Sequence, residues 1–279
     1  MIEQVYRVFP RRTRATPTDD LAIVNRGPGL FDRPTEVHVS VSFTWDLKRG
    51  EELAKLWSQV APSSIGGPAT GAAGGVFVPG RYLKPGYVIT SRGCPNRCWF
   101  CSVWKREGHV VRELPIVDGW NVMDDNLLAC SEKHIRGVFN MLGGYKSKSE
   151  FTGGLEAARL TDWHVDLLAD LKPHQAFFAY DTPDDYEPLV EAGKKLWKAD
   201  SRIGRSHNYR AYVLIGYPKD TFAAAERRCR AAWKAGFFPM AMLYNAHDGN
   251  QQPEWKSFQR QWANPYIIAT SLKDRRAAG

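Results

Sequence analysis

Between residues 86 and 244, short runs rich in β-branched and aromatic residues alternate with longer segments of helical periodicity. The expected strands lie at 86–91, about 120–129, 150–156, 175–181, 210–216 and 237–244. The expected helices lie at 131–143, 162–171, 184–197 and 220–235. Strands that alternate with helices in this way form a parallel sheet with right-handed crossovers. This alternation therefore predicts an α/β fold with six parallel strands.

The residues before this region predict a smaller unit. Residues 1–34 are polar and rich in Arg, Pro, Thr and Asp, which is typical of an extended arm. Residues 36–44 alternate strictly between apolar and polar side chains, which predicts a strand. Asp46 is expected to cap a helix that continues to about residue 60, and residues 63–68 predict a short strand and a turn.

The expected domain boundary falls in residues 69–84, a stretch rich in Gly, Ala and Pro that is typical of a linker or a loop. We expect an N-terminal arm with a small β-α-β appendage over residues 1–80. The larger α/β domain, with a C-terminal helical segment, is expected over residues 81–279. In that segment Trp255, Phe258 and Trp262 recur at helical spacing, so they either pack on the larger domain or stack nucleic-acid bases.

Three of the five cysteines lie within eight residues, directly after the first strand of the larger domain. Cys94, Cys98 and Cys101 have the spacing C-x3-C-x2-C, which lets one loop deliver three thiolates to a metal centre. A cubane iron–sulfur cluster normally takes four cysteines, so one iron would remain open to another ligand. Cys130 and Cys229 lie elsewhere, and this pattern is not a disulfide framework. Reduced thiols of this kind indicate a cytoplasmic setting.

A strand that ends in a three-cysteine loop, with Phe100 directly before the last cysteine, resembles the signature of the radical S-adenosylmethionine (SAM) superfamily. The resemblance implies a partial (β/α)6 TIM-like barrel and a [4Fe–4S] cluster on Cys94, Cys98 and Cys101. It also implies that the open iron chelates SAM, with Phe100 near the adenine. The implied activity is reductive cleavage of SAM to a 5′-deoxyadenosyl radical, which abstracts a hydrogen atom from a substrate. An external one-electron reductant such as flavodoxin or ferredoxin would supply the electron.

Active sites of parallel α/β barrels form at the carboxyl ends of the strands, so polar residues there are site candidates. The resemblance assigns cofactor binding to Phe100, Asp125, Asn126, Gly153, Gly154, Glu156, Asp181 and Met242. The candidates for catalysis are Asp125, Glu156 and Tyr180. Structural alternatives stay open: Asp125 and Asn126 could cap a helix, Glu156 could point outward from a bulge, and Asp181 could cap the next turn.

Residues 36–244 also resemble a compact radical SAM group of phage and prokaryotic genomes. That resemblance implies modification or rearrangement of a nucleoside or nucleic acid, including phage DNA hypermodification. The N-terminal β-α-β piece resembles a vestige of the domain that precedes the barrel in cobalamin-dependent members. It is too short to hold cobalamin and has no D-x-H-x-x-G loop, so no cobalamin is expected. Peptide modification is the alternative reaction, but no cysteine-rich C-terminal extension for auxiliary clusters is found.

The competing class of protein is a non-catalytic zinc or nucleic-acid binding module. In the zinc version, His109 would join Cys94, Cys98 and Cys101 as the fourth ligand. Of the net charge of +8, +6 lies between residues 227 and 279, which carry nine basic and three acidic residues. Lys273, Arg275 and Arg276 in this region could contact phosphates, or they could simply belong to a solvated surface.

No apolar run is long enough to cross a bilayer, and charged residues interrupt the N-terminus, so neither a membrane partner nor a signal peptide is expected.

Overall fold

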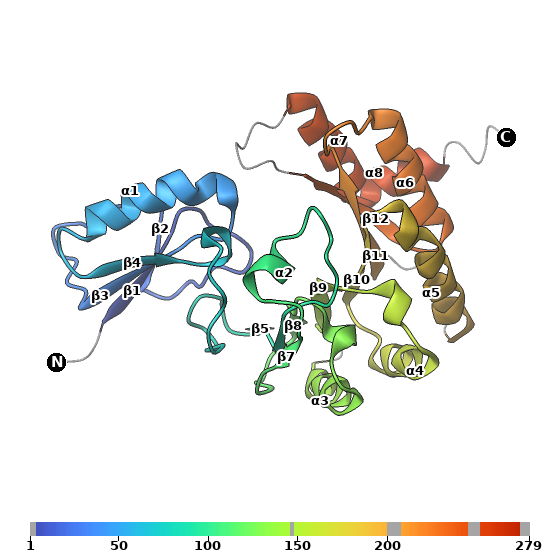
Figure 1. Ribbon diagram of the computed structural model, residues 1–279, viewed down its shortest axis with the longest axis horizontal. Coiled ribbons are helices and arrows are strands. Elements are labelled where there is room, and N and C mark those ends of the chain that lie inside the picture. The colour runs from blue at the N-terminus through green and yellow to red at the C-terminus, as the bar shows by residue number, and fades with distance from the viewer. Residues whose placement is uncertain (1–3, 146–147, 200–207, 245–251, 274–279) are drawn as a thin grey trace. The chain divides into compact units, whose positions relative to one another are not determined.

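The computed structural model describes the chain apart from residues 1–3, 146–147, 200–207, 245–251 and 274–279. The described chain forms two compact units, Met1–Gly119 and Trp120–Gly279 (Figure 1). In this part of the chain, no helix is both long enough and apolar enough to cross a membrane. Short 3-10 turns lie at Thr44–Asp46, Pro68–Thr70, Leu127–Ala129, Ala157–Arg159 and Pro183–Asp185.

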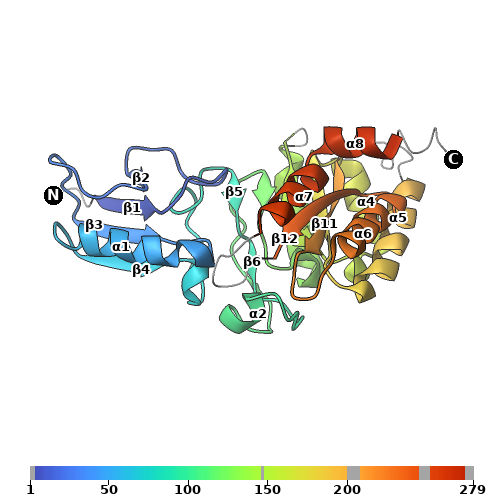
Figure 2. The ribbon, with the colours of Figure 1, turned by 90° about the horizontal axis from the view of Figure 1, so that it is seen from above.

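The first unit is built on a four-stranded parallel sheet of order β2-β1-β3-β4. Its strands are β1 Val5–Phe9, β2 Ala22–Val24, β3 Glu36–Ser40 and β4 Ser63–Gly66. Helix α1, Leu47–Trp57, lies along this sheet (Figures 1 and 2). The alternation predicted for β3 is confirmed, because Val37 and Val39 are buried in a core with Leu53 and Trp57 of α1. This apolar contact holds the helix on the sheet.

Two of these strands, β1 and β2, fall in residues 1–34, which the sequence predicts to be an extended arm. That expectation is wrong, because β1 pairs with both β2 and β3. The sequence pattern does not predict β1, because the charged residue Arg7 interrupts its run of apolar residues. Its guanidinium is nevertheless buried, because it donates to the carbonyl oxygen of Gly80 at 2.9 Å and pairs with Asp19.

Asp46 precedes α1 as predicted, but its side chain does not cap the helix. The carboxylate instead accepts two hydrogen bonds from Arg11, at 2.5 and 2.7 Å. These hydrogen bonds raise the pKa of Arg11 above its ordinary value. The pair ties the segment after β1 to the start of α1.

Four short elements complete the first unit: β5 Tyr87–Val88, β6 Ser91–Arg92, α2 Val103–Arg106 and β7 Arg112–Glu113. The single strand expected at 86–91 is therefore divided between β5 and β6. The two compact units divide the chain at Gly119, whereas the expected domains divide it at residue 80. The expected barrel domain over residues 81–279 stays a prediction.

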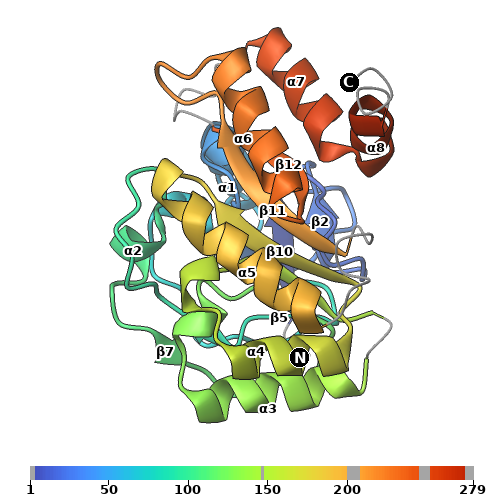
Figure 3. The same ribbon diagram turned by 90° about the vertical axis from the view of Figure 1, so that its right-hand side faces the viewer.

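The second unit contains five strands in the hydrogen-bonded order β12-β11-β10-β9-β8, and each pairs in parallel with its neighbour. They are β8 Asn121–Val122, β9 Glu150–Leu155, β10 Gln175–Tyr180, β11 Tyr209–Ile215 and β12 Phe238–Leu243. The connecting helices are α3 Glu132–Gly143, α4 Asp162–Leu171, α5 Tyr186–Ala199 and α6 Phe222–Lys234. All four lie on the same face of the sheet (Figures 1 and 3). The predicted α/β fold with parallel strands is confirmed.

Local signals in the sequence account for most of these boundaries. Ser131 caps α3 as predicted, because its hydroxyl accepts the backbone N–H of His134 at 3.3 Å. β8 is much shorter than the expected strand at 120–129, since the polar residues 124–126 leave the sheet and lead into a 3-10 turn.

Two C-terminal helices follow the last strand: α7 Pro253–Ala263 and α8 Pro265–Lys273. The side-chain amide of Gln259 in α7 donates to the carbonyl oxygen of Ala241 in β12 at 3.2 Å. The aromatic residues of α7 pack within the unit, since the rings of Trp255 and Phe258 lie 4.2 and 5.7 Å from that of Phe222 in α6. The expected packing of these side chains on the larger domain is therefore observed, and the stacking of bases stays an untested alternative.

A substitution at Gly193 tests the close packing between α5 and the end of α6. A methyl group at this position would clash with the carbonyl oxygen of Ala235, whereas one at Gly143, the last residue of α3, would meet open space. Gly193→Ala should lower the free energy of unfolding by about 1–3 kcal/mol, because the backbone must shift. Gly143→Ala is the matched control and should be neutral or stabilising by up to about 1 kcal/mol. Urea unfolding measures both, and equal stabilities for the two variants would contradict this packing.

Candidate functional site

The loop that carries the three cysteines is closed at its base by a short antiparallel ladder. Strands β6 and β7 pair there, with Arg92 opposite Arg112. Gly93 enters the loop with φ +92°, and a Cβ at this position would lie 2.5 Å from the carbonyl oxygen of Val110. Only glycine fits this close approach without strain. Cys94 N–H then donates to the carbonyl oxygen of Gly108 at 3.3 Å, so the two arms of the loop are joined directly beside the first cysteine.

Cys94, Cys98 and Cys101 are all half-buried in this loop, and none forms a disulfide. Cys101 N–H donates to the carbonyl oxygen of Cys98 at 3.1 Å, which makes a tight turn between the second and third cysteines. The backbone N–H of Val103 donates to Cys101 Sγ at 3.4 Å. Hydrogen bonds to sulfur favour the thiolate form and tune bound iron–sulfur clusters. Among the described residues, no three His, Cys, Asp or Glu side chains lie close enough together to form a metal-binding group.

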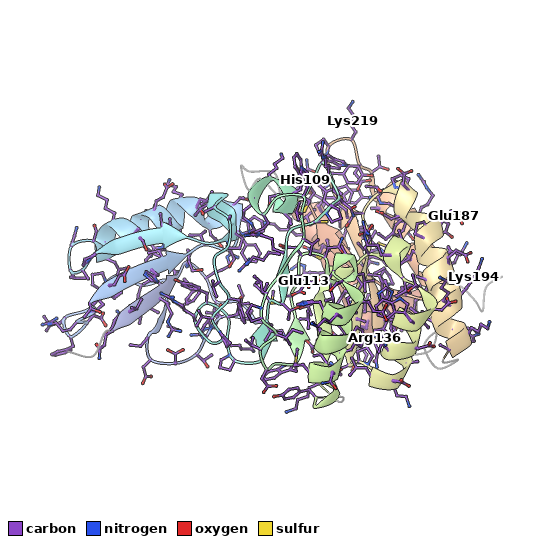
Figure 4. All side chains as sticks on the ribbon, turned by 60° about the horizontal axis from the view of Figure 1, so that its bottom comes forward. His109, Glu113, Arg136, Glu187, Lys194 and Lys219 are labelled. Atoms are coloured by element: carbon purple, nitrogen blue, oxygen red, sulfur yellow. The ribbon has the colours of Figure 1, made fainter. Side chains whose placement is uncertain are left out.

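The cysteine loop also carries several aromatic side chains. The indole N–H of Trp104 donates to the carbonyl oxygen of Cys98 at 3.0 Å, and its ring stacks on His109 with centroids 5.4 Å apart. His109 Nδ1 is buried and has no hydrogen-bond partner among the described residues. The proposed fourth zinc ligand therefore lies on the same loop as the cysteines, on the arm after α2 (Figure 4). Phe100 is half-buried and packs edge-on against Trp99, which is 53% exposed.

The sequence did not single out Glu107, although its side chain is 0% exposed. Its carboxylate lies 2.7 Å from Arg112 Nη2, 3.1 Å from Arg106 Nε and 3.6 Å from Arg92 Nη1. It also accepts the backbone N–H of Gly74 at 2.9 Å. No sequence signal distinguishes Glu107 from Glu113, which is exposed, because both lie among basic residues.

In the second unit, parallel pairing places the carboxyl ends of β8 to β12 at one edge of the sheet. Two predicted site residues meet there, since the side-chain amide of Asn126 donates to Glu156 Oε2 at 2.7 Å. Arg159 Nε donates to the same oxygen at 2.6 Å. Glu156 therefore turns toward the neighbouring strand end rather than outward from a bulge. Asp125, beside Asn126, is half-buried.

Gly153 and Gly154 occupy an irregular stretch of β9, where the register with β10 shifts. A Cβ at Gly153 would clash with the carbonyl oxygen of Asp124, and Gly154 has φ +96°. Close approach of the β8 and β9 backbones therefore explains Gly153 without any ligand. The predicted role of both glycines in cofactor binding stays a prediction.

Tyr180 is the last residue of β10, and Asp181 follows it directly. Tyr180 is 5% exposed, and its ring lies 5.8 Å from that of Tyr186 in α5, so it points toward the helices. This packing does not support a contact with substrate. Asp181 is half-buried, and its carboxylate makes no hydrogen bond or ion pair with any described residue. Burial and the nearby carboxylate of Asp185 raise the pKa of Asp181 to about 7.

The structural alternative for Asp181, an N-cap of the next turn, is not observed, because Thr182 is the N-cap there. Asp185 accepts hydrogen bonds from the backbone N–H groups of Asp181 and Thr182, at 3.0 and 2.7 Å. The Asp181 side chain is therefore not used for capping.

The turn after β11 holds further residues that the sequence analysis missed. Asp220 accepts the backbone N–H of Gly216 at 2.8 Å and pairs with Arg228 of α6 at 2.7 Å. In the sequence, Asp220 directly precedes Thr221, the N-cap of α6. An acidic residue at this position is the sequence feature that could have predicted these contacts. Met242, the candidate on β12, has an exposed side chain.

The predicted phosphate contacts cannot be placed, because the Lys273 side chain and residues 275 and 276 lie outside the part of the chain that is described.

Comparison with models of known protein families gives no match, and a search of curated proteins finds no match either.

Asp181 can be tested through the pH dependence of stability. With a pKa raised from 3.8 to about 7, this group keeps its proton in the folded chain after the unfolded chain has lost it. Its contribution to stability therefore falls as the pH rises through this window. Asp181→Asn removes the effect, so the stability of the variant relative to the unmodified chain should rise from about pH 4 to about pH 7 and then level off. Urea unfolding across this range measures the difference, and a flat difference would contradict the assignment.

Proposed function

We propose that this chain is a radical SAM enzyme, with a [4Fe–4S] cluster on Cys94, Cys98 and Cys101 and SAM as its second cofactor. The observation that carries the proposal is the closed C-x3-C-x2-C loop directly after β5 and β6. Three thiols on one loop, with a backbone N–H on Cys101 Sγ, suit the donor set that such a cluster requires. When bound, the cluster would supply the electron that cleaves SAM.

The second unit supports the proposed partial (β/α)6 barrel. Its four connecting helices lie on one face of a parallel sheet, as in the outer ring of a barrel, whereas doubly wound sheets carry helices on both faces. In barrels of this kind, the residues that bind and react lie at the carboxyl ends of the strands. Asn126, Glu156 and Asp181 are such residues.

The polar groups at these strand ends fit the chemistry of SAM. Carboxylate and amide oxygens accept hydrogen bonds from an ammonium group and from ribose hydroxyls. In the proposed enzyme, Asn126 and Glu156 bind such groups as a hydrogen-bonded pair. Asp181, whose pKa is raised to about 7, could accept or donate a proton near neutral pH. Phe100 would lie against the adenine, as the resemblance implies.

The proposed substrate is a nucleoside or a nucleic acid, which the enzyme would modify or rearrange, including in phage DNA hypermodification. Its support is the resemblance of residues 36–244 to the compact phage and prokaryotic group, together with a net charge of +8. Modification of a peptide is the alternative reaction. The proposed reductant is a flavodoxin or ferredoxin, and the proposed setting is the cytoplasm.

One observation favours a second candidate function, a zinc site. His109 shares the loop with the three cysteines, and its buried Nδ1 has no partner among the described residues. Zinc would take four ligands here, whereas a SAM-binding cluster would take only the three cysteines.

Cysteine substitutions test the proposed cluster. Cys94→Ala, Cys98→Ala or Cys101→Ala should each remove most of the iron and sulfide that the anaerobically reconstituted protein binds. Cys229→Ala is the matched control, because burial raises the pKa of this thiol to about 12 and keeps it protonated. Cys130→Ala should also keep the cluster. Iron and sulfide analysis with visible absorption measures the outcome, and loss of iron in the Cys229 variant would count against the assignment.

His109→Ala separates the cluster from the zinc site. The proposed enzyme should keep about four irons per chain in this variant, since His109 is not one of its ligands. A four-coordinate zinc site should instead bind zinc more weakly by a large factor, because it loses one ligand. Metal analysis after purification with iron and with zinc distinguishes the two, and iron lost in parallel with zinc would argue against a three-cysteine cluster.

A further inference from the structure

The buried carboxylate of Glu107 binds residues from both arms of the cysteine loop. Arg92 stands two positions before Cys94, and Arg112 lies on the returning strand β7. Arg106 belongs to α2, which follows the last cysteine. The entry to the loop, its helix and its exit therefore meet at one carboxylate.

A contact outside the loop adds to this arrangement. The backbone N–H of Gly74 donates to Glu107 Oε1 at 2.9 Å. A Cβ at Gly74 would clash with the guanidinium of Arg92, so this backbone lies directly on that side chain. Glu107 thus also fixes the loop to the segment that precedes β5.

Glu107 offsets a concentration of positive charge at this place. The side chains of Arg92 and Arg106 are only 16% and 9% exposed, and Arg112 is 48% exposed. Three guanidinium groups so close together repel one another, and burial of a charge without a partner is costly. The Glu107 carboxylate, which has no exposed surface, lies within 3.6 Å of all three.

Glu107 is also linked to the first cysteine through its neighbour in the sequence. The next residue, Gly108, provides the carbonyl oxygen that accepts the N–H of Cys94 at 3.3 Å. A carboxylate that holds residue 107 in place therefore also holds the acceptor beside Cys94.

We propose that Glu107 is a positioning residue that fixes the two arms of the cysteine loop and sets the place of Cys94 relative to Cys98 and Cys101. Its relevance to a metal centre rests on the proposed function. The fixing of the loop itself does not, because it depends only on contacts within the first unit.

Hydrogen exchange of the metal-free protein tests this role. Glu107→Gln keeps the size of the side chain and removes its charge, so the amides of Cys94 and of the loop from 93 to 111 should exchange faster by roughly 100-fold. Glu51→Gln is the matched control, since it makes the same chemical change at an exposed residue of α1, outside the loop. It should leave exchange of the loop unchanged. Unchanged protection in the Glu107 variant, or equal loss in both variants, would overturn the proposal.

A second variant covers the case in which Glu107→Gln does not fold. Arg112→Gln removes the most exposed of the three guanidinium groups and should speed exchange of the same amides by a smaller factor, about two- to fivefold. No change in this variant would contradict the role of Glu107.

Iron content separates this inference from the proposed function. If the unmodified chain binds a cluster, Glu107→Gln should bind less iron while Glu51→Gln binds the same amount. If the unmodified chain binds no iron, the proposed function fails, and the exchange result still decides the role of Glu107. If Glu107→Gln keeps the hydrogen-exchange protection of the loop and the full iron content, the positioning role of Glu107 is overturned. The proposal of a cluster on the three cysteines is not affected by that result.

Discussion

Parallel pairing of β8 to β12 is the constraint on which the second unit depends. Parallel neighbours require a crossover between them, so the chain returns through a helix after each strand. Every strand then ends at the same edge of the sheet. Asn126 and Glu156 are 30 residues apart in sequence and yet hydrogen-bond at 2.7 Å, because they follow neighbouring parallel strands. The polar residues at this edge therefore follow from the topology, and the alternation of strands and helices in the sequence predicts that topology.

The cysteine loop depends on two different constraints. Its base is closed by the β6–β7 ladder, and Gly93 allows the backbone to approach the opposite arm. Its interior is ordered by electrostatics, since one buried carboxylate at Glu107 serves three guanidinium groups. Backbone contacts and a buried charge therefore limit the positions that the three cysteines of this loop can adopt. This order would lower the entropic cost of binding the proposed cluster.

Periodicity predicted most of the second unit, and in the first unit it predicted β3, α1 and β4 but not β1 and β2. The helices from α3 to α6 and the strands from β9 to β12 follow sequence patterns that persist over six or more residues. Strand β1 was missed because its charged residue Arg7 is buried through a partner as distant in sequence as Gly80. Strand β2, Ala22–Val24, is only three residues long, which is too short to show a period. At the candidate site, the sequence identified the cysteines and the polar strand ends. It could not identify Glu107, or the face toward which Tyr180 points, because both depend on packing between segments that are distant along the chain.

The central claim is that the cysteine loop holds a cluster that cleaves SAM. Mass spectrometry for 5′-deoxyadenosine tests it most directly, after anaerobic incubation of the reconstituted protein with SAM and a strong reductant. The account predicts that this product forms with the unmodified chain and with Cys229→Ala, and that it does not form with Cys98→Ala. A protein that carries its full complement of iron and sulfide but produces no 5′-deoxyadenosine, with or without nucleosides, DNA and peptides, would contradict the account.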